Sequence, residues 1–325
     1  MNSEFTVKAA ELIPVGAGLA RPECVLAFAS GSLLVSHLGV GATALAPDGA
    51  QRLVGPTASA DPDFLPNGIS LTAEGNLLVA NIGPQGGVWE INRSGRRVLV
   101  YAAADGVPLR AANFVFLDQA GRTWITVSTI REPRFEAYDS EVADGFVCLV
   151  RDGRAHIVAN GLGFTNEVRL SPDGRHLYVS ETFARRVSRY PVAPDGSLGA
   201  RETFTAFGRG TFPDGLAFDA AGHLWLTGIV SNQIFRIAPS GEPRLVLEDA
   251  DAAFVDDVET ALAAGQMRRE HLYRQAPGRL PNIASIAFGG SDLRTAYLGS
   301  LLGDRLFTFR SPVPGAALPH WRWTP

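Results

Sequence analysis

The sequence predicts an all-β fold, a six-bladed β-propeller, on three observations. A segment of two short apolar runs joined by a Gly-containing turn recurs six times along the 325 residues. The chain has 35 Gly and 21 Pro, as a fold with many tight turns requires. Amphipathic helix patterns are almost absent. Repeated units of short antiparallel strands are typical of propellers.

Each repeat begins with a polar residue, alternates in hydropathy, turns at Gly and enters a second apolar run. The six copies are RPECVLAFASGSLLVSH from Arg21, LPNGISLTAEGNLLVAN from Leu65, AANFVFLDQAGRTWITV from Ala111, FTNEVRLSPDGRHLYVSE from Phe164, FPDGLAFDAAGHLW from Phe212 and LPNIASIAFGGSDLRTAYLGS from Leu280. A third strand follows most copies and a fourth follows many, as in GGVWEINRSG and RRVLVYA. We therefore expect six four-stranded blades in a single domain, residues 1–325.

One interval between repeats is too long for a turn. Residues 251–280, between the fifth and sixth copies, are rich in Ala, Leu, Glu and Arg. This composition predicts a helical insertion. It is compatible with a lid, an oligomer contact or a neutral embellishment.

Composition narrows the class of protein. A formal net charge of -4 gives no basic surface for nucleic acid, and no apolar run is long enough to span a bilayer. The first 20 residues lack the basic and apolar regions of a signal peptide. Cys24 and Cys148 are expected to be reduced thiols. We expect a cytoplasmic protein that acts on a small molecule; its oligomeric state stays open.

The polar residue at the head of each repeat carries the functional prediction. In a propeller the innermost strands surround the channel, so equivalent positions form a ring at one end. The six head residues are Glu23, Asn67, Asn113, Asn166, Asp214 and Asn282. Any single one is explained by turn chemistry, but six in register favour a ring of oxygen ligands. Two carboxylates in one ring repel each other unless a cation lies between them.

The ligand types predict the class of metal. Carboxylate and amide oxygens suit a hard divalent ion, whereas a structural zinc site would need Cys or His. Two more ionisable residues, His37 and Glu181, end second strands on the same face and are candidate bases or supporting groups. Phe114, Phe164 and Phe212 flank head residues and predict a less polar pocket, unless they pack between blades.

These motifs resemble the SMP-30/gluconolactonase/LRE family of six-bladed propellers. The resemblance rests on Pro22-Glu23, GFTNEVRLSPDGRHLYVSET and FPDGLAFDAAGHLW. It implies one divalent metal held by Glu23, Asn166 and Asp214, with Asn113 at the metal or the substrate. It also implies a metal-dependent hydrolase of lactones. Ca²⁺ is the first expectation, with Mn²⁺, Mg²⁺ and Zn²⁺ as alternatives.

The third repeat departs from the family pattern. In RAANF, Ala111 stands where the sugar lactonases have Arg, Phe114 replaces Asp, and Arg110 is one residue out of place. The residues that would hold sugar hydroxyls are therefore missing. A lactone or ester less polar than a sugar lactone is the resulting expectation.

The sequence thus predicts an enzyme that opens a lactone or ester with metal-activated water. The catalytic candidates are Asp214 as general base, Asn113, Glu181 and His37. The substrate-binding candidates are Asn67, Asn113, Phe114, Phe164, Phe212 and Asn282. The alternatives are phosphotriester hydrolysis, an elimination or an isomerisation at the same metal, or a propeller that binds metal or ligand without catalysis.

Overall fold

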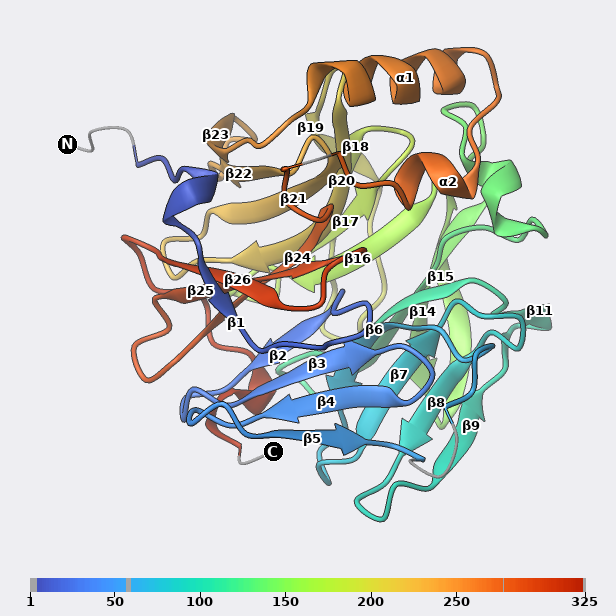
Figure 1. The fold of residues 1–325 in the computed structure, drawn as a ribbon. Coiled ribbons are helices and arrows are strands. Elements are labelled where there is room, and N and C mark those ends of the chain that lie inside the picture. Colours follow the sequence, from blue (N-terminus) through green and yellow to red (C-terminus); the bar gives the residue numbers. More distant parts are fainter. Residues whose placement is uncertain (1–4, 57–59, 277, 324–325) are drawn as a thin grey trace.

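A computed structural model describes residues 5–56, 60–276 and 278–323. In these ranges, six sheets are arranged around a central axis (Figure 1), which confirms the predicted six-bladed propeller. The four strands of blade one are β2 (Val25–Ala27), β3 (Leu33–His37), β4 (Gly41–Leu45) and β5 (Gln51–Val54). Those of blade two are β6 (Pro66–Leu71), β7 (Leu77–Asn81), β8 (Val88–Ile91) and β9 (Arg97–Tyr101).

Blades three and four continue the circle. Blade three contains β12 (Ala112–Leu117), β13 (Thr123–Val127), β14 (Gly145–Arg151) and β15 (Arg154–Leu162), extended at its outer edge by the short β10 (Ala103–Ala104) and β11 (Val107–Pro108). Blade four contains β16 (Thr165–Leu170), β17 (His176–Glu181), β18 (Arg186–Pro191) and β19 (Glu202–Ala206). The extra strands make blade three the widest sheet.

The last two blades close the propeller. Blade five contains β20 (Thr211–Phe218), β21 (Leu224–Val230), β22 (Gln233–Ile237) and β23 (Pro243–Leu247). Blade six contains β24 (Ile283–Gly289), β25 (Thr295–Ser300), β26 (Leu306–Arg310) and β1 (Ile13–Val15). Because β1 comes from the start of the chain and pairs antiparallel with β26, the two ends of the sequence meet within one sheet.

The innermost strands are buried because each has a neighbouring inner strand on either side. Every residue of β20 and β24 is buried, and the inner strands contact one another in the order β2, β6, β12, β16, β20, β24 and back to β2. Large side chains such as Trp124 and Trp225, both 0% exposed, fill the space between blades. The channel is thus surrounded by rigid, packed strands, which suits a precise site.

The helices gather at one end of the channel. α1 (Ala252–Ala263) and α2 (Arg269–Leu272) follow β23 and precede β24, and they lie at the top of Figure 1. The side chain of Asp251 caps α1 by accepting a hydrogen bond from the Phe254 amide (2.9 Å). Phe254 and Val258 of α1 pack in one cluster with Phe212 of blade five. Among the described residues, none of the helices has the length and apolar character to cross a membrane.

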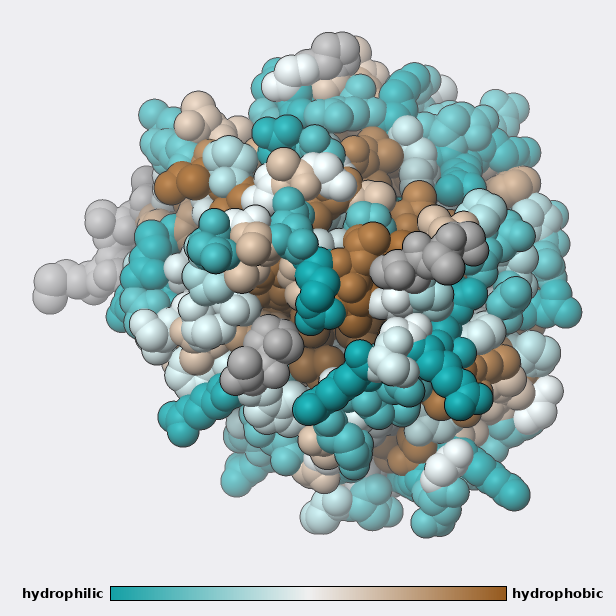
Figure 2. All heavy atoms as spheres, turned by 60° about the horizontal axis from the view of Figure 1, so that its bottom comes forward, coloured by the Kyte–Doolittle hydropathy of each residue, from teal (hydrophilic) through white to brown (hydrophobic). Residues whose placement is uncertain are grey.

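Within the described ranges there are also three short 3₁₀ helices: η1 (Ala9–Glu11), η2 (Arg134–Ala137) and η3 (Pro319–Arg322). η3 belongs to the C-terminal segment, which lies at the opposite end from α1 and α2 (Figure 1). That end is hollowed and exposes hydrophobic atoms in the hollow (Figure 2). A cavity of about 630 Å³ at that end is lined by hairpin-turn residues and by residues 314–319.

Candidate active site

The six polar head residues are all buried. Their side chains belong to residues between 1% and 6% exposed: Glu23, Asn67, Asn113, Asn166, Asp214 and Asn282. They occupy equivalent places at or just before the six inner strands, at the same end as α2. We call these six residues the ring.

Irregular pairing of the inner strands lies at the ring positions. The register shifts between Pro66 and Ile69 in β6, and the corresponding shifts in β12, β16 and β20 span Asn113, Asn166 and Asp214. A bulge leaves a residue outside the regular ladder and redirects its side chain. The same irregularity in strand pairing therefore orients a ring residue in four of the blades.

Two of the ring residues are each followed by a Gly that allows neighbouring blades to pack closely. A Cβ on Gly215 would lie 2.5 Å from the Ala284 carbonyl oxygen and 2.6 Å from the Ser285 Cα, both in blade six. A Cβ on Gly68 would meet the Phe114 Cα at 2.6 Å. Asp214-Gly215 lies inside β20, so the dipeptide is part of an inner strand and not a turn.

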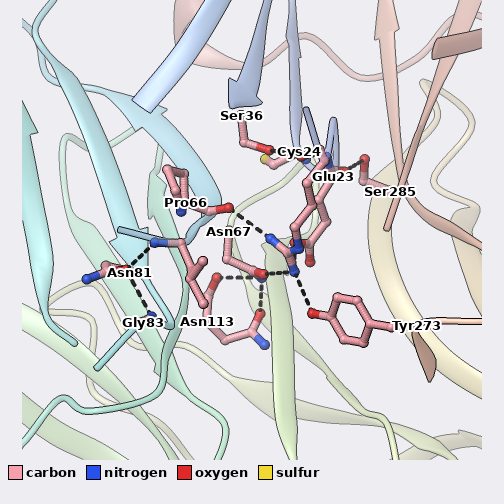
Figure 3. Close-up of polar contacts among 12 residues, drawn as sticks. Glu23, Cys24, Ser36, Pro66, Asn67, Asn81, Gly83, Asn113, Tyr273 and Ser285 are labelled. Atoms are coloured by element: carbon pink, nitrogen blue, oxygen red, sulfur yellow. Dashed lines mark hydrogen bonds and ion pairs between the residues drawn. The ribbon is translucent and has the colours of Figure 1, made fainter. Parts of the chain in front are cut away.

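Arg21 places a cation inside the ring. One of its guanidinium nitrogens lies 2.5 Å from Glu23 Oε2, an ion pair without hydrogen-bond alignment. The same guanidinium donates to the Pro66 carbonyl (2.9 Å), to Asn67 Oδ1 (2.8 Å) and to the Tyr273 hydroxyl (3.4 Å), as Figure 3 shows. Arg21 has φ 53°, a left-handed conformation that non-Gly residues rarely adopt.

A chain of hydrogen bonds links Arg21 to the wall of the channel mouth. Asn67 Nδ2 donates to the backbone and side-chain oxygens of Asn113, both at 3.0 Å. Asn113 Nδ2 donates to Ser128 Oγ (2.9 Å), which also accepts from Arg134 (3.1 Å). The side chains of Asn67 and Asn113 are therefore in contact. The orientation of their amides depends on Arg21 and Arg134.

Burial and mutual repulsion perturb the two ring carboxylates. Desolvation is the largest cause that raises the pKa of Asp214, and the charges of Glu23 and Glu167 raise it further. Desolvation also raises the pKa of Glu23, against the opposing effects of Arg21 and Arg134. These shifts identify a site that would be stabilised by an added cation.

A third buried carboxylate lies next to the ring. Burial raises the pKa of Glu167 to about 7. Its Oε2 accepts a hydrogen bond from the Leu216 amide (3.1 Å) and lies 3.2 Å from Arg169. Arg169 in turn stacks over the Phe114 ring, 4.5 Å from its centroid. Glu167 and Arg169 thus form a charged pair deeper in the channel. The comparison of the six repeats did not identify this pair.

The donor set fits a hard divalent cation. Asn166 Nδ2 donates to Thr182 Oγ1 (3.0 Å), while Asn166 Oδ1 is buried without a hydrogen-bond partner. An amide oxygen without a partner, in the same ring as two carboxylates with raised pKa, is what an oxygen-ligated ion would satisfy. Across the described ranges, no three His, Cys, Asp or Glu side chains cluster as a metal site, so the ligands would be Glu23, Asp214 and amide oxygens.

A pocket of about 550 Å³ opens at the mouth of the channel. We call it the mouth pocket. Its walls come from segments outside the repeated strand pairs: residues 82–84, 110–111, 131–135 and 268–270, with Leu65, Tyr138 and Tyr273. Tyr273 contacts Arg21, and Arg134 contacts Ser128, so two of its wall residues reach the ring network directly.

Two predicted catalytic residues, Glu181 and His37, have hydrogen-bond partners within their own blades. Glu181 is 0% exposed, and its carboxylate accepts from Arg186 at two nitrogens (2.8 Å each), from the Gly163 amide (2.7 Å) and from Ser188. His37 Nδ1 pairs with Thr43 Oγ1 of its own blade (2.8 Å). These contacts favour structural roles over the predicted catalytic ones.

Asn282 holds the insertion to the propeller. Its Oδ1 accepts from the Val230 amide (2.6 Å) and its Nδ2 donates to the Leu272 carbonyl at the end of α2 (2.7 Å). Asn282 therefore ties blades five and six to α2. Its contacts position the mouth-pocket wall, and its predicted role in substrate binding stays a prediction.

The three phenylalanines predicted to line the site are packed between blades. Phe114, Phe164 and Phe212 are 2%, 4% and 0% exposed, and none of them lines the mouth pocket. Phe164 packs edge-on against Tyr138 (5.3 Å between centroids). This placement matches the packing alternative and gives no support to a less polar substrate.

Sequence reasoning missed the residues that come from outside the repeats. Arg134 lies in η2 and Tyr273 follows α2, so no comparison of blades could align them with the ring. Arg21 lies two residues before Glu23, and its ion pair could have been predicted from the sequence. A basic residue beside a predicted carboxylate cluster is a signal for such a pair.

Comparisons with known proteins agree with the propeller fold. The profile of the SMP-30/Gluconolactonase/LRE-like region matches residues 42–273. A 6-deoxy-6-sulfogluconolactonase from Pseudomonas putida is 28% identical over 218 residues, 62% of each chain. A pentonolactonase from Haloferax volcanii is 30% identical over 48% of this chain and 44% of its own. The chain thus aligns with about half to three fifths of these relatives.

A solved structure covers almost the whole chain. The gluconolactonase of Xanthomonas campestris superposes with a TM-score of 0.68 over 97% of this chain and 95% of its own, at 19% sequence identity. At that identity the match shows the shared fold, including the blades at both ends of the sequence that the family profile does not span.

Proposed function

The chain belongs to the SMP-30/gluconolactonase/LRE-like family, and from that premise we propose that it is a divalent-metal-dependent hydrolase that opens a lactone. One observation carries the proposal: two buried carboxylates with raised pKa, Glu23 and Asp214, lie in a ring whose other members are amides. The named activities of the two lactonase relatives support the reaction class.

The residues that would hold the ion are Glu23, Asp214 and Asn166, with Asn113 as a further oxygen. When bound, a divalent ion polarises a carbonyl oxygen and lowers the pKa of water. Ligands that are all oxygen atoms favour Ca²⁺ over Zn²⁺.

Asp214 is the proposed proton acceptor. Burial and the charges of Glu23 and Glu167 raise its pKa, so its carboxylate accepts a proton more readily than an exposed aspartate does. Glu23 cannot take this role as readily, because Arg21 is paired with it.

Two guanidinium groups near the ring would stabilise negative charge that develops there during the reaction. The positive charges of Arg134 and Arg21 oppose the rise in the pKa of Glu23 and Asp214 that burial causes. Attack of hydroxide on a lactone carbonyl puts negative charge on its oxygen, and fixed cations in a buried site stabilise that charge. Tyr138 and Tyr273 line the mouth pocket together with Arg134.

A substrate panel tests the proposal. Proton release would be followed with D-glucono-1,5-lactone, an aryl ester and a phosphotriester, each with chelator and with added Ca²⁺. We expect Ca²⁺-dependent turnover of the lactone above the other two. Turnover of the phosphotriester alone, or Ca²⁺ binding with no turnover of any of the three, would contradict it.

A further inference from the structure

The wall of the mouth pocket is unusually basic. Five arginines line it: Arg110, Arg131, Arg134, Arg268 and Arg269. Two carboxylates, Glu132 and Glu270, share the same wall, so the lining carries a formal charge of +5 − 2 = +3. The whole chain has a net charge of -4. The positive charge is therefore local to the pocket.

Two of the five arginines are neutralised by neighbours. Arg110 pairs with Glu132, and Arg131 lies 3.3 Å from Asp144. In the part of the chain that the structure describes, no carboxylate lies within ion-pair distance of Arg134, Arg268 or Arg269. These three cations are therefore available to a ligand.

Aromatic rings hold the three unpaired arginines in place. The guanidinium of Arg134 lies 4.6 Å from the Phe164 centroid, and that of Arg269 lies 4.6 Å from Tyr273. Arg268 lies 5.5 Å from Phe135. Stacking orients a guanidinium and leaves its edge free to donate to an oxyanion. The Nε of Arg134 is buried without a hydrogen-bond partner, which adds an unsatisfied donor to this wall.

We propose that the mouth pocket binds an anionic substituent of the substrate, a carboxylate, sulfonate or phosphate at the end of the molecule away from the lactone carbonyl. This inference rests on the proposed function only in taking the substrate to be a lactone. Planar guanidinium groups match the paired oxygens of all three anions. The arginines also join the pocket to the ring, since Arg134 contacts Ser128 and Tyr273 contacts Arg21. A substrate bound by its anion would thus extend toward Asp214.

The substrate class has a matched pair of probes. D-glucono-1,4-lactone and D-glucaro-1,4-lactone differ only in a terminal hydroxymethyl group or carboxylate. Calorimetric titration of both into chelator-treated protein measures binding without turnover. We expect the carboxylate to bind at least about tenfold more tightly, as charge-assisted hydrogen bonds provide. The 6-sulfonate and 6-phosphate of gluconolactone then rank the three anions.

The variants assign the preference to named residues. The double variant Arg268→Gln/Arg269→Gln should remove most of the preference for the carboxylate. The matched control is Arg244→Gln, an exposed arginine of β23 without an ion pair among the described residues; it should keep the wild-type preference. Raising the salt from about 50 mM to about 500 mM should weaken the anion selectively in the wild type, a readout that needs no variant to fold.

The outcomes separate this inference from the proposed function. Equal binding of the two lactones by the wild type, or an undiminished preference in the folded double variant, overturns the anionic subsite even if both lactones are hydrolysed. A tenfold preference that the double variant loses supports the subsite even if neither lactone is turned over, in which case the proposed hydrolase activity is the part that fails.

Discussion

A guanidinium nitrogen of Arg21 lies 2.5 Å from Oε2 of Glu23, inside the ring where a metal ligand is expected. Both side chains are less than 10% exposed, at 9% and 8%. The arginine therefore acts as an internal counter-ion for Glu23, and a bound divalent ion would compete with it for the same carboxylate oxygen.

Replacement of Arg21 should make thermal stability depend more strongly on bound Ca²⁺. Arg21→Met leaves the Glu23 charge buried and unpaired, which costs about 3–5 kcal/mol in chelator. Added Ca²⁺ should recover most of that loss, so thermal unfolding should shift further with Ca²⁺ in the variant than in the wild type. Arg97→Met is the control, because Arg97 pairs with Asp61 away from the ring (2.7 Å). Equal Ca²⁺-induced shifts in Arg21→Met and the wild type would count against competition.

The close approach of blades five and six makes Gly215 irreplaceable. A Cβ there would overlap backbone atoms of Ala284 and Ser285 at 2.5 and 2.6 Å, and backbone cannot shift as cheaply as a flexible side chain. Gly215→Ala should lower the free energy of unfolding by about 3 kcal/mol or more, measured by urea denaturation. Gly208→Ala meets nothing within 4 Å and should stay within about 0.5 kcal/mol of the wild type. Similar losses in both variants would show that the packing argument is mistaken.

Acid should destabilise the C-terminal segment through His320. Burial, with the nearby Arg169 charge, lowers the pKa of His320 from 6.5 to about 3. Between those values the unfolded chain binds a proton that the folded chain does not, so stability falls as the pH drops below 6.5. The loss at pH 5 is about 2 kcal/mol.

His320→Phe supplies the control for that titration. Phenylalanine keeps the packing against Phe28, whose ring lies 5.3 Å from that of His320, and cannot take up a proton. Urea denaturation at pH 7 and pH 5 should therefore show a smaller pH-dependent loss in the variant. An identical loss in both proteins would assign the acid sensitivity to other groups.

Glu181 should prove structural. Its carboxylate holds Arg186 and the Gly163 amide in the interior of blade four, so Glu181→Gln should lower stability by about 3 kcal/mol. The kcat of the folded fraction with the lactone should remain within about twofold of the wild type. A loss of kcat above a hundredfold in a protein of unchanged stability would restore the catalytic role that the sequence predicted.

The repeat pattern was sufficient to predict the fold, because the sequence of each blade contains its own turn residues and its own alternation of apolar and polar residues. The ring residues were found in the same way, since register links one blade to the next. The bulges that aim Asn67, Asn113 and Asp214 were invisible, because they arise from pairing with neighbouring strands. The closing strand β1 was missed because Ile13–Val15 is short and contains a proline.

The substrate pocket could not be read from the repeats. Its arginines lie on connections and on the insertion, whose placement depends on tertiary contacts such as the Asn282 bonds to Val230 and Leu272. Phe114 and Phe212 flank ring residues in sequence, but strand twist and blade packing turn them into the core. Proximity in sequence was therefore a poor guide to the pocket lining.

The most direct test of the account is Ca²⁺ titration with simultaneous measurement of lactone hydrolysis, in the wild type and in Asp214→Asn. Chelator-treated wild type should regain hydrolysis of the lactone as Ca²⁺ binds at one site. Asp214→Asn, folded by circular dichroism, should bind Ca²⁺ at least about tenfold more weakly and lose hydrolysis by at least about a hundredfold. Wild-type hydrolysis that persists in chelator, or an Asp214→Asn protein with full activity, would contradict a metal-centred ring.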